Sequence, residues 1–408
     1  MNIRPARGPT VPTAYGAALL ALALSSQAAV AQTLNQATTA QLAADGSFVP
    51  CELLLGGDDP LVALTGQLAS ICTRFVDMAG PPSSSSGGGF AATPPSAPAA
   101  VEARLEKDTD EATGTATRGF FLTVGTDSID RIATPFEDGY DSDVVRIAAG
   151  FDKLFGGNKI FGFAVDASEQ EGDFLDGGNF EIGNTGLTGF GSLLIGEQAA
   201  FNFYAGLARL SNERLRRATF SEVSGDSFMP TFFSVVGTAR ADFDADQTLF
   251  GFQYSYNWAW DNFTFGPRIG YDWNKTAYDT YSEIDNVGLG LTFHDDEETS
   301  SQWSAGLVGS VAVSTSFGVV VIEESLLYKY ESDQDQRDVQ VSFVEDIRPA
   351  PRRFTYQTER PDRDFLEFSV GATFVLRNGL QVLAEYRGIT SHDYLDSNAI
   401  AVGFRNEF

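Results

Sequence analysis

The sequence predicts an all-β protein, a twelve-stranded antiparallel transmembrane β-barrel over residues 118–408, and three observations carry this prediction. From Gly119 to the C-terminus, large apolar residues alternate with polar or small ones, so that each segment has an apolar and a polar face. The connections between these segments are alternately short and long. The chain also has 33 phenylalanines and 41 glycines, which suit a β-structured wall. Strands of about ten residues joined in this way are typical of outer-membrane barrels.

The bulk composition bounds the class of protein but does not by itself indicate a membrane protein. The hydrophobic content of 43% is ordinary for a globular chain of 408 residues. No stretch after residue 31 has the roughly 20 uninterrupted apolar residues that a membrane-spanning helix needs, whereas a barrel strand needs only alternate ones. The formal net charge of −28 disfavours nucleic acid as a partner, because phosphate would be repelled.

Residues 1–31 are typical of a secretory signal peptide. Arg4 and Arg7 give a positive start, residues 14–24 are apolar, and Ala29-Val30-Ala31 offers a cleavage site. The alternative, an apolar helix retained as an anchor, is disfavoured because the segment is too short to span a membrane comfortably. Export places the mature chain in an oxidising compartment.

Two further regions precede the predicted barrel and its lead-in. Residues 32–80 form a small segment that holds both cysteines, Cys51 and Cys72, which are expected to form a disulfide after export. Two unpaired thiols are the alternative, and a metal site is disfavoured because no histidine lies nearby. Residues 81–98 are a linker rich in proline, serine and glycine, a composition that cannot bury a core.

Residues 99–117 contain a predicted short helix and the lead-in to the first strand. Between residues 99 and 111, Ala100, Val101 and Leu105 stand among charged residues, and Pro98 precedes them, where proline is tolerated. Such a helix would cover ~20 Å at about 1.5 Å per residue. The alternative interpretation is a solvated amphipathic linker.

The alternation that predicts the barrel is clearest in its second half. In residues 263–274, Phe265, Ile269 and Tyr271 share one face, and Arg268 and Asp272 share the other. Twelve strands are predicted to begin near residues 119, 143, 159, 181, 200, 243, 262, 302, 318, 363, 379 and 397. Long connections are predicted at residues 128–142, 171–180, 213–242, 276–301, 332–362 and, more modestly, 391–396.

The strand predicted near residue 318 departs from strict alternation. It contains Glu323 and Glu324 side by side, so one carboxylate would face lipid in a regular strand. A β-bulge would instead turn both side chains inward. Both arrangements are compatible with the sequence.

Several ordered segments carry a resemblance to a known family. They are Gly139-Tyr140-Asp141-Ser142-Asp143, Ala149-Gly150-Phe151-Asp152, Ile160-Phe161-Gly162-Phe163-Ala164, Phe265-Gly266-Pro267-Arg268-Ile269-Gly270-Tyr271 and Tyr281-Ser282-Glu283. Together they resemble the autotransporter β-domain, the outer-membrane barrel of type V secretion. The last ten residues, with Phe404 and the terminal Phe408, look like the signal that the barrel-assembly machinery reads.

The resemblance implies a barrel plugged by a helix, which places an N-terminal passenger on the cell surface. Residues 99–111 stand where that helix would lie, directly before the first strand. Contacts between plug and lumen are then expected from charged residues on both: Glu102 and Arg104 in the plug, and Arg146, Arg268, Asp272, Glu385 and Arg387 in the wall.

Two departures from the family pattern limit what the resemblance implies. Residues 32–98 are few and contain no repeat, whereas passengers of this family are long, repetitive β-helices. Residues 99–111 contain no asparagine, the residue at which some members cleave themselves. The passenger is therefore expected to stay attached.

The sequence assigns no catalytic, cofactor-binding or metal-binding residue. His294 and His392 lie in expected outer loops, without the local sequence of outer-membrane proteases or phospholipases. The acidic run 295–298 lacks the spaced ligands and glycine of an EF-hand loop and is expected to be solvated. Three arginines of the third loop would contact lipopolysaccharide phosphates or pair with neighbouring acids: Arg214, Arg216 and Arg217.

The sequence therefore favours an autotransporter-like barrel that anchors and displays a short N-terminal segment, without enzymatic turnover. The alternative is an adhesin- or receptor-like barrel that works through its outer loops while the N-terminal segment stays periplasmic. A third hypothesis, an outer-membrane hydrolase, would need a catalytic histidine. The expected partners are outer-membrane lipid, lipopolysaccharide and the barrel-assembly machinery, and the sequence names no surface ligand.

Overall fold

The structure, a computed structural model, describes residues 118–407 apart from short gaps at 135–137, 156–157, 176, 197, 225–230, 261, 287, 317, 334–336, 345, 347–348, 352, 359–361 and 377–379. The side chains of residues 218–235, 354, 356, 357 and 407 are also outside the description. The predictions for the signal peptide, the cysteine pair, the linker, the plug with Glu102 and Arg104, and Phe408 fall on residues outside the described part. No helix among the described residues is long and apolar enough to cross a membrane.

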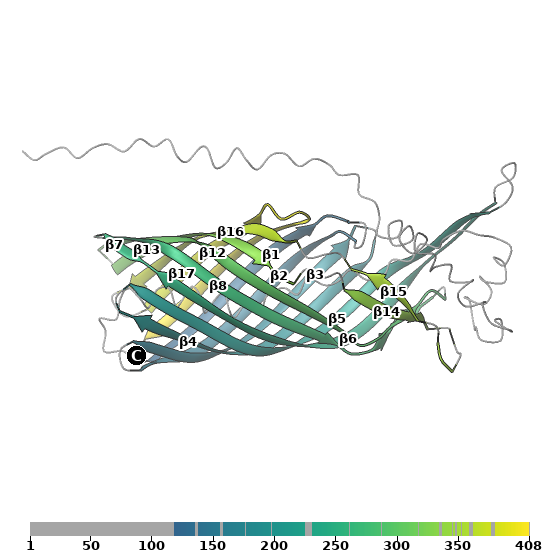
Figure 1. Ribbon diagram of the computed structural model, residues 1–408, viewed down its shortest axis with the longest axis horizontal. Coiled ribbons are helices and arrows are strands. Elements are labelled where there is room, and N and C mark those ends of the chain that lie inside the picture. The colour runs from purple at the N-terminus through teal and green to yellow at the C-terminus, as the bar shows by residue number, and fades with distance from the viewer. Residues whose placement is uncertain are drawn as a thin grey trace, which may run out of the picture. The chain divides into compact units, whose positions relative to one another are not determined.

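Twelve antiparallel strands close into a barrel (Figure 1). The main sheet has 14 strands in the order β10-β6-β5-β4-β3-β2-β1-β18-β17-β16-β13-β12-β8-β7, and β6 also pairs with β8. That pairing closes the ring and leaves β7 (Trp258–Trp260) and β10 (Ile284–Asp285) as short side strands. The barrel strands are β1 (Arg118–Arg131), β2 (Tyr140–Phe155), β3 (Lys159–Phe174), β4 (Asn179–Ile195), β5 (Ala199–Ser224), β6 (Thr231–Tyr256), β8 (Phe263–Tyr278), β12 (Asp296–Ser314), β13 (Gly318–Glu331), β16 (Asp364–Leu376), β17 (Leu380–Thr390) and β18 (Leu395–Glu407).

The predicted fold class is confirmed, and most strands begin close to the predicted residues. One end of the barrel, the turn end, carries the short connections at 156–158, 196–198, 257–262, 315–317 and 377–379. The other, the loop end, carries the connections at 132–139, 175–178, 225–230, 279–295, 332–363 and 391–394. The second of these is shorter than predicted.

The prediction of a long third loop over residues 213–242 is wrong. β5 and β6 continue through most of it and remain paired from Ala199 opposite Tyr256 to Ser224 opposite Thr231. The resulting hairpin extends beyond the neighbouring strands (Figure 1). Many of its residues are polar on both faces, such as Arg214, Arg217 and Asp242, so the alternation that marks the other strands is absent there.

Side chains of the barrel strands alternate between a polar lumen and an apolar outer face. Outward residues include Phe163, Leu207 and Ile400, which are 54%, 64% and 57% exposed. Inward residues such as Arg268 and Gln247 are buried. An apolar outer band with a polar interior is the pattern of a barrel that faces lipid.

The lumen wall formed by β1–β4 contains a buried apolar cluster. Phe121, Ala148, Ala164 and Phe190 form one buried cluster, with Tyr204 of β5 packed against it. The ring of Phe121 lies over Gly150, where an added Cβ would come within 2.2 Å of it. Glycine therefore allows the ring to lie flat against the neighbouring strand.

Two predicted long loops form a second, four-stranded sheet, here called the outer cap. Its strand order is β15-β14-β11-β9. β9 (Tyr281–Ser282) and β11 (Leu291–Phe293) come from the connection between β8 and β12, and β14 (Asp338–Phe343) and β15 (Phe354–Gln357) from that between β13 and β16. Leu291, Val341 and Phe343 are buried in it. These loops are therefore ordered elements with a core of their own.

The register of β13 decides between the two arrangements of Glu323 and Glu324. Pairing with β12 runs without interruption from Val319 to Glu331, so no bulge lies beside the glutamates. Glu323, opposite Ser310, shares the inner face, and Glu324, opposite Gly309, is exposed on the outer face. The regular strand is thus the observed arrangement.

Candidate functional site

The lumen is the site at which the sequence predicted charged contacts. Arg146 of β2 lies on the inner face and binds Asp127 of β1, with Nη2 2.8 Å from Oδ2. The other oxygen of Asp127 accepts a hydrogen bond from Ser397 Oγ at 2.8 Å, which links β1 to β18. The first and last strands of the barrel are therefore joined by side chains as well as by backbone.

The wall from β8 to β17 carries the other predicted lumenal residues. Arg268, Glu385 and Arg387 line one small hollow of the inner surface, together with Glu323 and Glu367. Arg387 lies 3.3 Å from Glu385, on the same strand. Three of the five predicted wall residues, which lie on β8 and β17, thus line one hollow.

Asp272, the remaining predicted residue, connects the charged wall to the apolar one. Its Oδ1 accepts a hydrogen bond of 2.5 Å from Tyr204 of β5. Its Oδ2 lies 3.7 Å from Lys329 Nζ, and Lys329 lies 3.8 Å from Glu367. Sequence reasoning missed Lys329, although the alternation Tyr328-Lys329-Tyr330 places it on the polar face. The lumen thus combines this charged wall with the aromatic cluster of β1–β4, a wall that also carries the ion pair of Arg146 and Asp127.

At the loop end, a buried ion pair joins the β5–β6 hairpin to the outer cap. Arg216 Nε and Nη2 each donate to a carboxylate oxygen of Glu283 at 2.7 Å, and both side chains are 2% exposed. Nη2 also donates to the carbonyl of Leu289 at 2.8 Å, and Leu291 N donates to Glu283 Oε2 at 2.9 Å. Of the two sequence alternatives for Arg216, pairing with an acid is the observed one.

Aromatic stacking reinforces the same junction. Phe243 of β6 stacks on Tyr281 with ring centroids 3.9 Å apart, and Tyr281 stacks on Phe293 at 4.7 Å. Arg214 is also buried, with its guanidinium 5.2 Å from the ring centre of Phe174. Neither Arg214 nor Arg216 is thus exposed to lipopolysaccharide phosphates.

The outer face near the loop end carries rows of carboxylates from neighbouring strands. Glu171 lies directly opposite both Asp143 and Glu181, and Glu181 lies opposite Glu213. A second row contains four aspartates from β18 to β3: Asp396, Asp130, Asp141 and Asp173. Like charges that face each other across strands are destabilising, so these rows favour a surrounding rich in cations.

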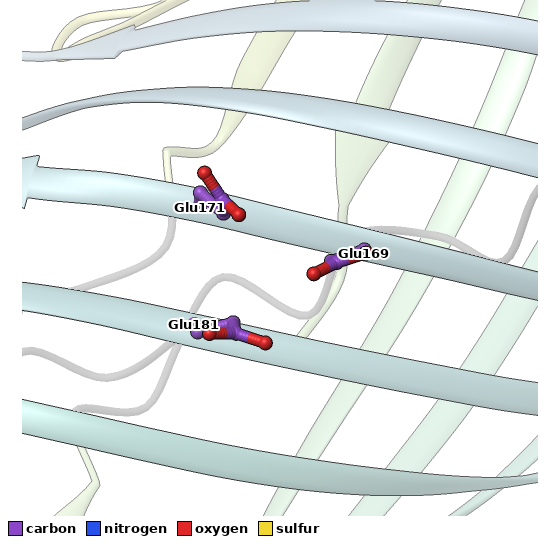
Figure 2. A group of neighbouring side chains, drawn as sticks. All are labelled: Glu169, Glu171 and Glu181. Atoms are coloured by element: carbon purple, nitrogen blue, oxygen red, sulfur yellow. The ribbon is translucent and has the colours of Figure 1, made fainter.

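Two of these carboxylates, together with Glu169, have the spacing of a metal site. Figure 2 shows Glu169 and Glu171 on β3 beside Glu181 on β4. One oxygen from each lies within 4.8 Å of the others, and all three side chains are exposed. Oxygen ligands of this type suit Ca²⁺ or Mg²⁺, but exposed acidic groups with this spacing are common without an ion.

Comparison with known proteins identifies the family. The model of the autotransporter beta-domain matches residues 120–387, which is more than half of the chain. The chain belongs to the autotransporter β-domain family. Its predicted resemblance to that family is thereby confirmed.

Solved autotransporter domains are among the matching structures. The translocator domain of the autotransporter NalP from Neisseria meningitidis has a TM-score of 0.55 and 15% identity, over 77% of this chain and 96% of that one. The beta domain of the Bordetella autotransporter Brka has a TM-score of 0.48 and 12% identity, over 72% of this chain and 100% of that one. The transport unit of AIDA-I from Escherichia coli has a TM-score of 0.45 and 10% identity, over 76% and 98%. A search of curated proteins found no match.

The two histidines of this autotransporter β-domain lie in separate loop-end connections. His294 Nε2 is 3.2 Å from Ser342 Oγ in the outer cap, and partial burial lowers its pKa. His392 Nδ1 accepts a hydrogen bond from the backbone N of Tyr394 at 3.4 Å and lies 3.5 Å from Asp362. His294 thus lies beside a hydroxyl, but no group among the described residues hydrogen-bonds its other ring nitrogen, so these contacts give the hydrolase hypothesis no support.

The acidic run 295–298 of the autotransporter β-domain is held by cations and a threonine. Arg337 lies 3.0 Å from Asp296 and 3.5 Å from Glu298, and Lys275 lies 2.7 Å from Glu297. Asp295 Oδ1 accepts hydrogen bonds from Thr280, which lower the pKa of this carboxyl. Residues 296–298 are thus the paired first residues of β12, which corrects the expectation that the whole run is a solvated loop.

The C-terminal strand of the autotransporter β-domain presents Phe404 to the outside. Phe404 is 48% exposed and lies opposite Leu122 of β1 and Val382 of β17. It thus sits on the apolar outer face of the strand that closes the barrel. The role of Phe404 in barrel assembly remains a prediction.

Proposed function

We propose that this chain is anchored in the outer membrane by its barrel and displays residues 32–98 at the cell surface. The observation that supports the proposal is that the first and the last strand of the barrel start and finish at the same end. Gly119, at the start of β1, pairs with Glu407, at the end of β18, so both lie at the turn end. Short turns face the periplasm in outer-membrane barrels and long loops face outward.

The route from the turn end to the surface is the lumen. In this proposal the signal peptide directs export, residues 99–117 fill the lumen as a plug, and residues 32–98 leave at the loop end with Cys51 and Cys72 joined. The lumen supports the proposal, because it offers both a buried apolar cluster and charged side chains to an amphipathic plug that carries Glu102 and Arg104.

The side chains on the outer face of the barrel suggest the proposed partners. The apolar band contacts outer-membrane lipid, and the carboxylate rows lie near lipopolysaccharide, whose divalent cations would screen their repulsion. The barrel-assembly machinery would read β18 with Phe404 and Phe408. Turnover of a substrate is not part of the proposed function.

The test is an epitope tag inserted after Gln32 and probed with antibody on intact and on permeabilised cells. Labelling of intact cells is expected. Labelling that requires permeabilisation would place the segment in the periplasm and overturn the proposal. A tag inserted in the connection 225–230, at the tip of the β5–β6 hairpin, is the matched control for surface access.

The alternative, an adhesin- or receptor-like barrel, has its own supporting observation. The outer cap and the β5–β6 hairpin are ordered structures fastened by the buried pair of Arg216 and Glu283. A surface that binds a ligand needs elements that hold its side chains in fixed positions. Deletion of residues 32–98 discriminates between the two, since only the alternative predicts that cell-surface binding survives.

A further inference from the structure

A carboxyl group lies on the lipid-facing surface of β13, near the middle of the strand. Glu324 is the seventh of the 14 residues of β13 and is exposed on the outer face. Ile322 and Leu326, its neighbours on that face, are 41% and 52% exposed. Strands tilted by about 40° rise roughly 2.5 Å per residue along the barrel axis. Glu324 therefore lies roughly 15 Å from the turn end, near the middle of an apolar band about 25 Å tall.

Glu324 has no polar partner among the residues that the structure describes. Its side chain forms no hydrogen bond or ion pair with any of them. The residues opposite it are Gly309 of β12 and Val370 of β16, and neither has a polar side chain. An ionisable group at membrane depth is costly and is usually paired with another polar group. Glu324 therefore indicates a partner from outside this barrel wall.

The surface around Glu324 would let another protein approach closely. Gly309 has no side chain, and a Cβ there would be no nearer than 3.5 Å to its closest neighbour, the carbonyl oxygen of Thr264. Ala372 of β16 lies opposite Ile322 on the other side. In lipid, close packing over small residues and hydrogen bonds between proteins drive association. We call the outer surface formed by Glu324, Gly309, Leu326 and Ala372 the Glu324 face.

A second copy of the chain offers a carboxyl group at the same depth. Copies of one protein enter the membrane in the same orientation, so a two-fold axis along the membrane normal brings a residue of one copy opposite the same residue of the other. Two carboxyl groups at such an axis can share a proton, with one group donating to an oxygen of the other. Lipid tails offer no such donor. The chemistry of Glu324 therefore matches that of its own copy.

We propose that the Glu324 face is the interface of a homodimer in the outer membrane, in which the carboxyl groups of two copies of Glu324 hydrogen-bond to each other. The interface lies on the outer surface of the barrel and does not depend on where residues 32–98 lie. The dimer forms only where two barrels meet. In a barrel diluted into excess lipid, Glu324 stays unpaired and destabilises that barrel.

The first test is cysteine cross-linking of the full-length chain in outer-membrane fractions, in a background with Cys51→Ser and Cys72→Ser. Oxidation with copper-phenanthroline is expected to join two copies of Leu326→Cys into a dimer that a reductant reverses. The matched control is Val165→Cys. Val165 is the seventh residue of β3, is 53% exposed on the outer face and lies six strands away around the barrel. A severalfold higher dimer yield at Leu326 supports the proposal.

The second test measures the dissociation constant of the dimer in liposomes by single-molecule photobleaching over a range of protein-to-lipid ratios. Glu324→Leu should raise this constant by about tenfold, the effect expected for one hydrogen bond lost in a membrane. Glu324→Gln should keep most of the affinity, because two carboxamides can donate to and accept from each other. Glu323→Gln is the control, since Glu323 shares the inner face and should leave dimerisation unchanged. Heat-dependent mobility in gel electrophoresis shows that each variant is folded.

Three results would overturn the proposal. Equal cross-linking of Leu326→Cys and Val165→Cys would show that barrels meet only by random collision. Cross-linking of Leu326→Cys to a protein of another mass would assign the Glu324 face to a different partner. An unchanged dissociation constant in folded Glu324→Leu would remove the carboxyl contact, even if two copies still meet on this face.

Discussion

Arg216 shows how one residue can fasten a surface element to a barrel. Its guanidinium is buried and bidentate to Glu283, and the two residues lie 67 positions apart in the sequence. A run of arginines in the sequence reveals the charge but not the distant partner, so the sequence left two alternatives open. Only the fold brings the two together.

Removing this arginine should loosen the outer cap. Arg216→Met leaves the Glu283 carboxylate buried without its partner, which costs about 3–5 kcal/mol in such pairs. Arg209→Met is the matched control, because Arg209 and Asp244 form an exposed pair and little change is expected there. Protease sensitivity and hydrogen exchange of the cap measure the effect. Equal responses of the two variants would contradict the prediction, and Arg216→Met with Glu283→Met should recover much of the loss.

His392 should make the last loop-end connection sensitive to pH. Burial lowers its pKa from the ordinary value of 6.5, while the carboxylate of Asp362 opposes this shift and Arg131 adds to it. The opened loop thus binds a proton more readily than the ordered one, and Nδ1 would lose its bond from Tyr394 N on protonation. The loop is therefore expected to stay ordered above about pH 6.5 and to lose stability as the pH falls below that value.

Hydrogen exchange of residues 391–394 at pH 7.5 and pH 5 measures this effect of His392. Faster opening at pH 5 is expected in the wild type, after correction for the intrinsic pH dependence of exchange. His392→Gln should remove the difference. A difference that persists in this variant would assign the sensitivity to another group.

At the scale of elements, β13 places a carboxylate on the lipid-facing band. Glu324 is exposed on the outer face between Ile322 and Leu326, which are 41% and 52% exposed. A charge at this depth destabilises an outer-membrane barrel, although acidic residues do so less than basic ones. Glu324→Leu should therefore stabilise the barrel, by up to about 2 kcal/mol.

The control for this prediction is the neighbouring glutamate. Glu323 faces the lumen and lines the charged hollow with Arg268 and Arg387, so Glu323→Leu should destabilise the barrel. Denaturant titration of folding into lipid bilayers measures both variants. A loss of stability in Glu324→Leu would mean that this carboxylate has a partner in the membrane.

The elements also show where pattern reading works and where it fails. Strands such as β8 and β16 were predictable because one face meets lipid and the other meets the lumen, which forces a period of two. Beyond the membrane both faces of β5 and β6 meet water or the cap. Residues 213–242 therefore do not alternate between apolar and polar side chains, and they were predicted as a loop. The outer cap was missed for the same reason, since its strands pair across two distant loops.

For the whole molecule, the closed barrel could be predicted from the sequence. The contacts between its lumenal side chains could be predicted only in part. Arg146, Arg268, Asp272, Glu385 and Arg387 follow from alternation, because an inward charge in a barrel strand has a fixed parity. Their partners do not follow, because neighbouring strands can be 270 residues apart, as with Ser397 and Asp127. Asp166, a buried residue of β3, follows the same parity but stands among small residues, where no charge pattern marked it.

The proposed plug predicts how the complete barrel conducts ions. Deletion of residues 99–111 should raise single-channel conductance in planar bilayers severalfold, because the polar lumen would open to water. The matched control is deletion of residues 84–96, an equally long part of the linker, which should leave conductance unchanged. If neither deletion changes conductance, residues 99–111 do not fill the lumen. If both raise it, the linker also obstructs the pore.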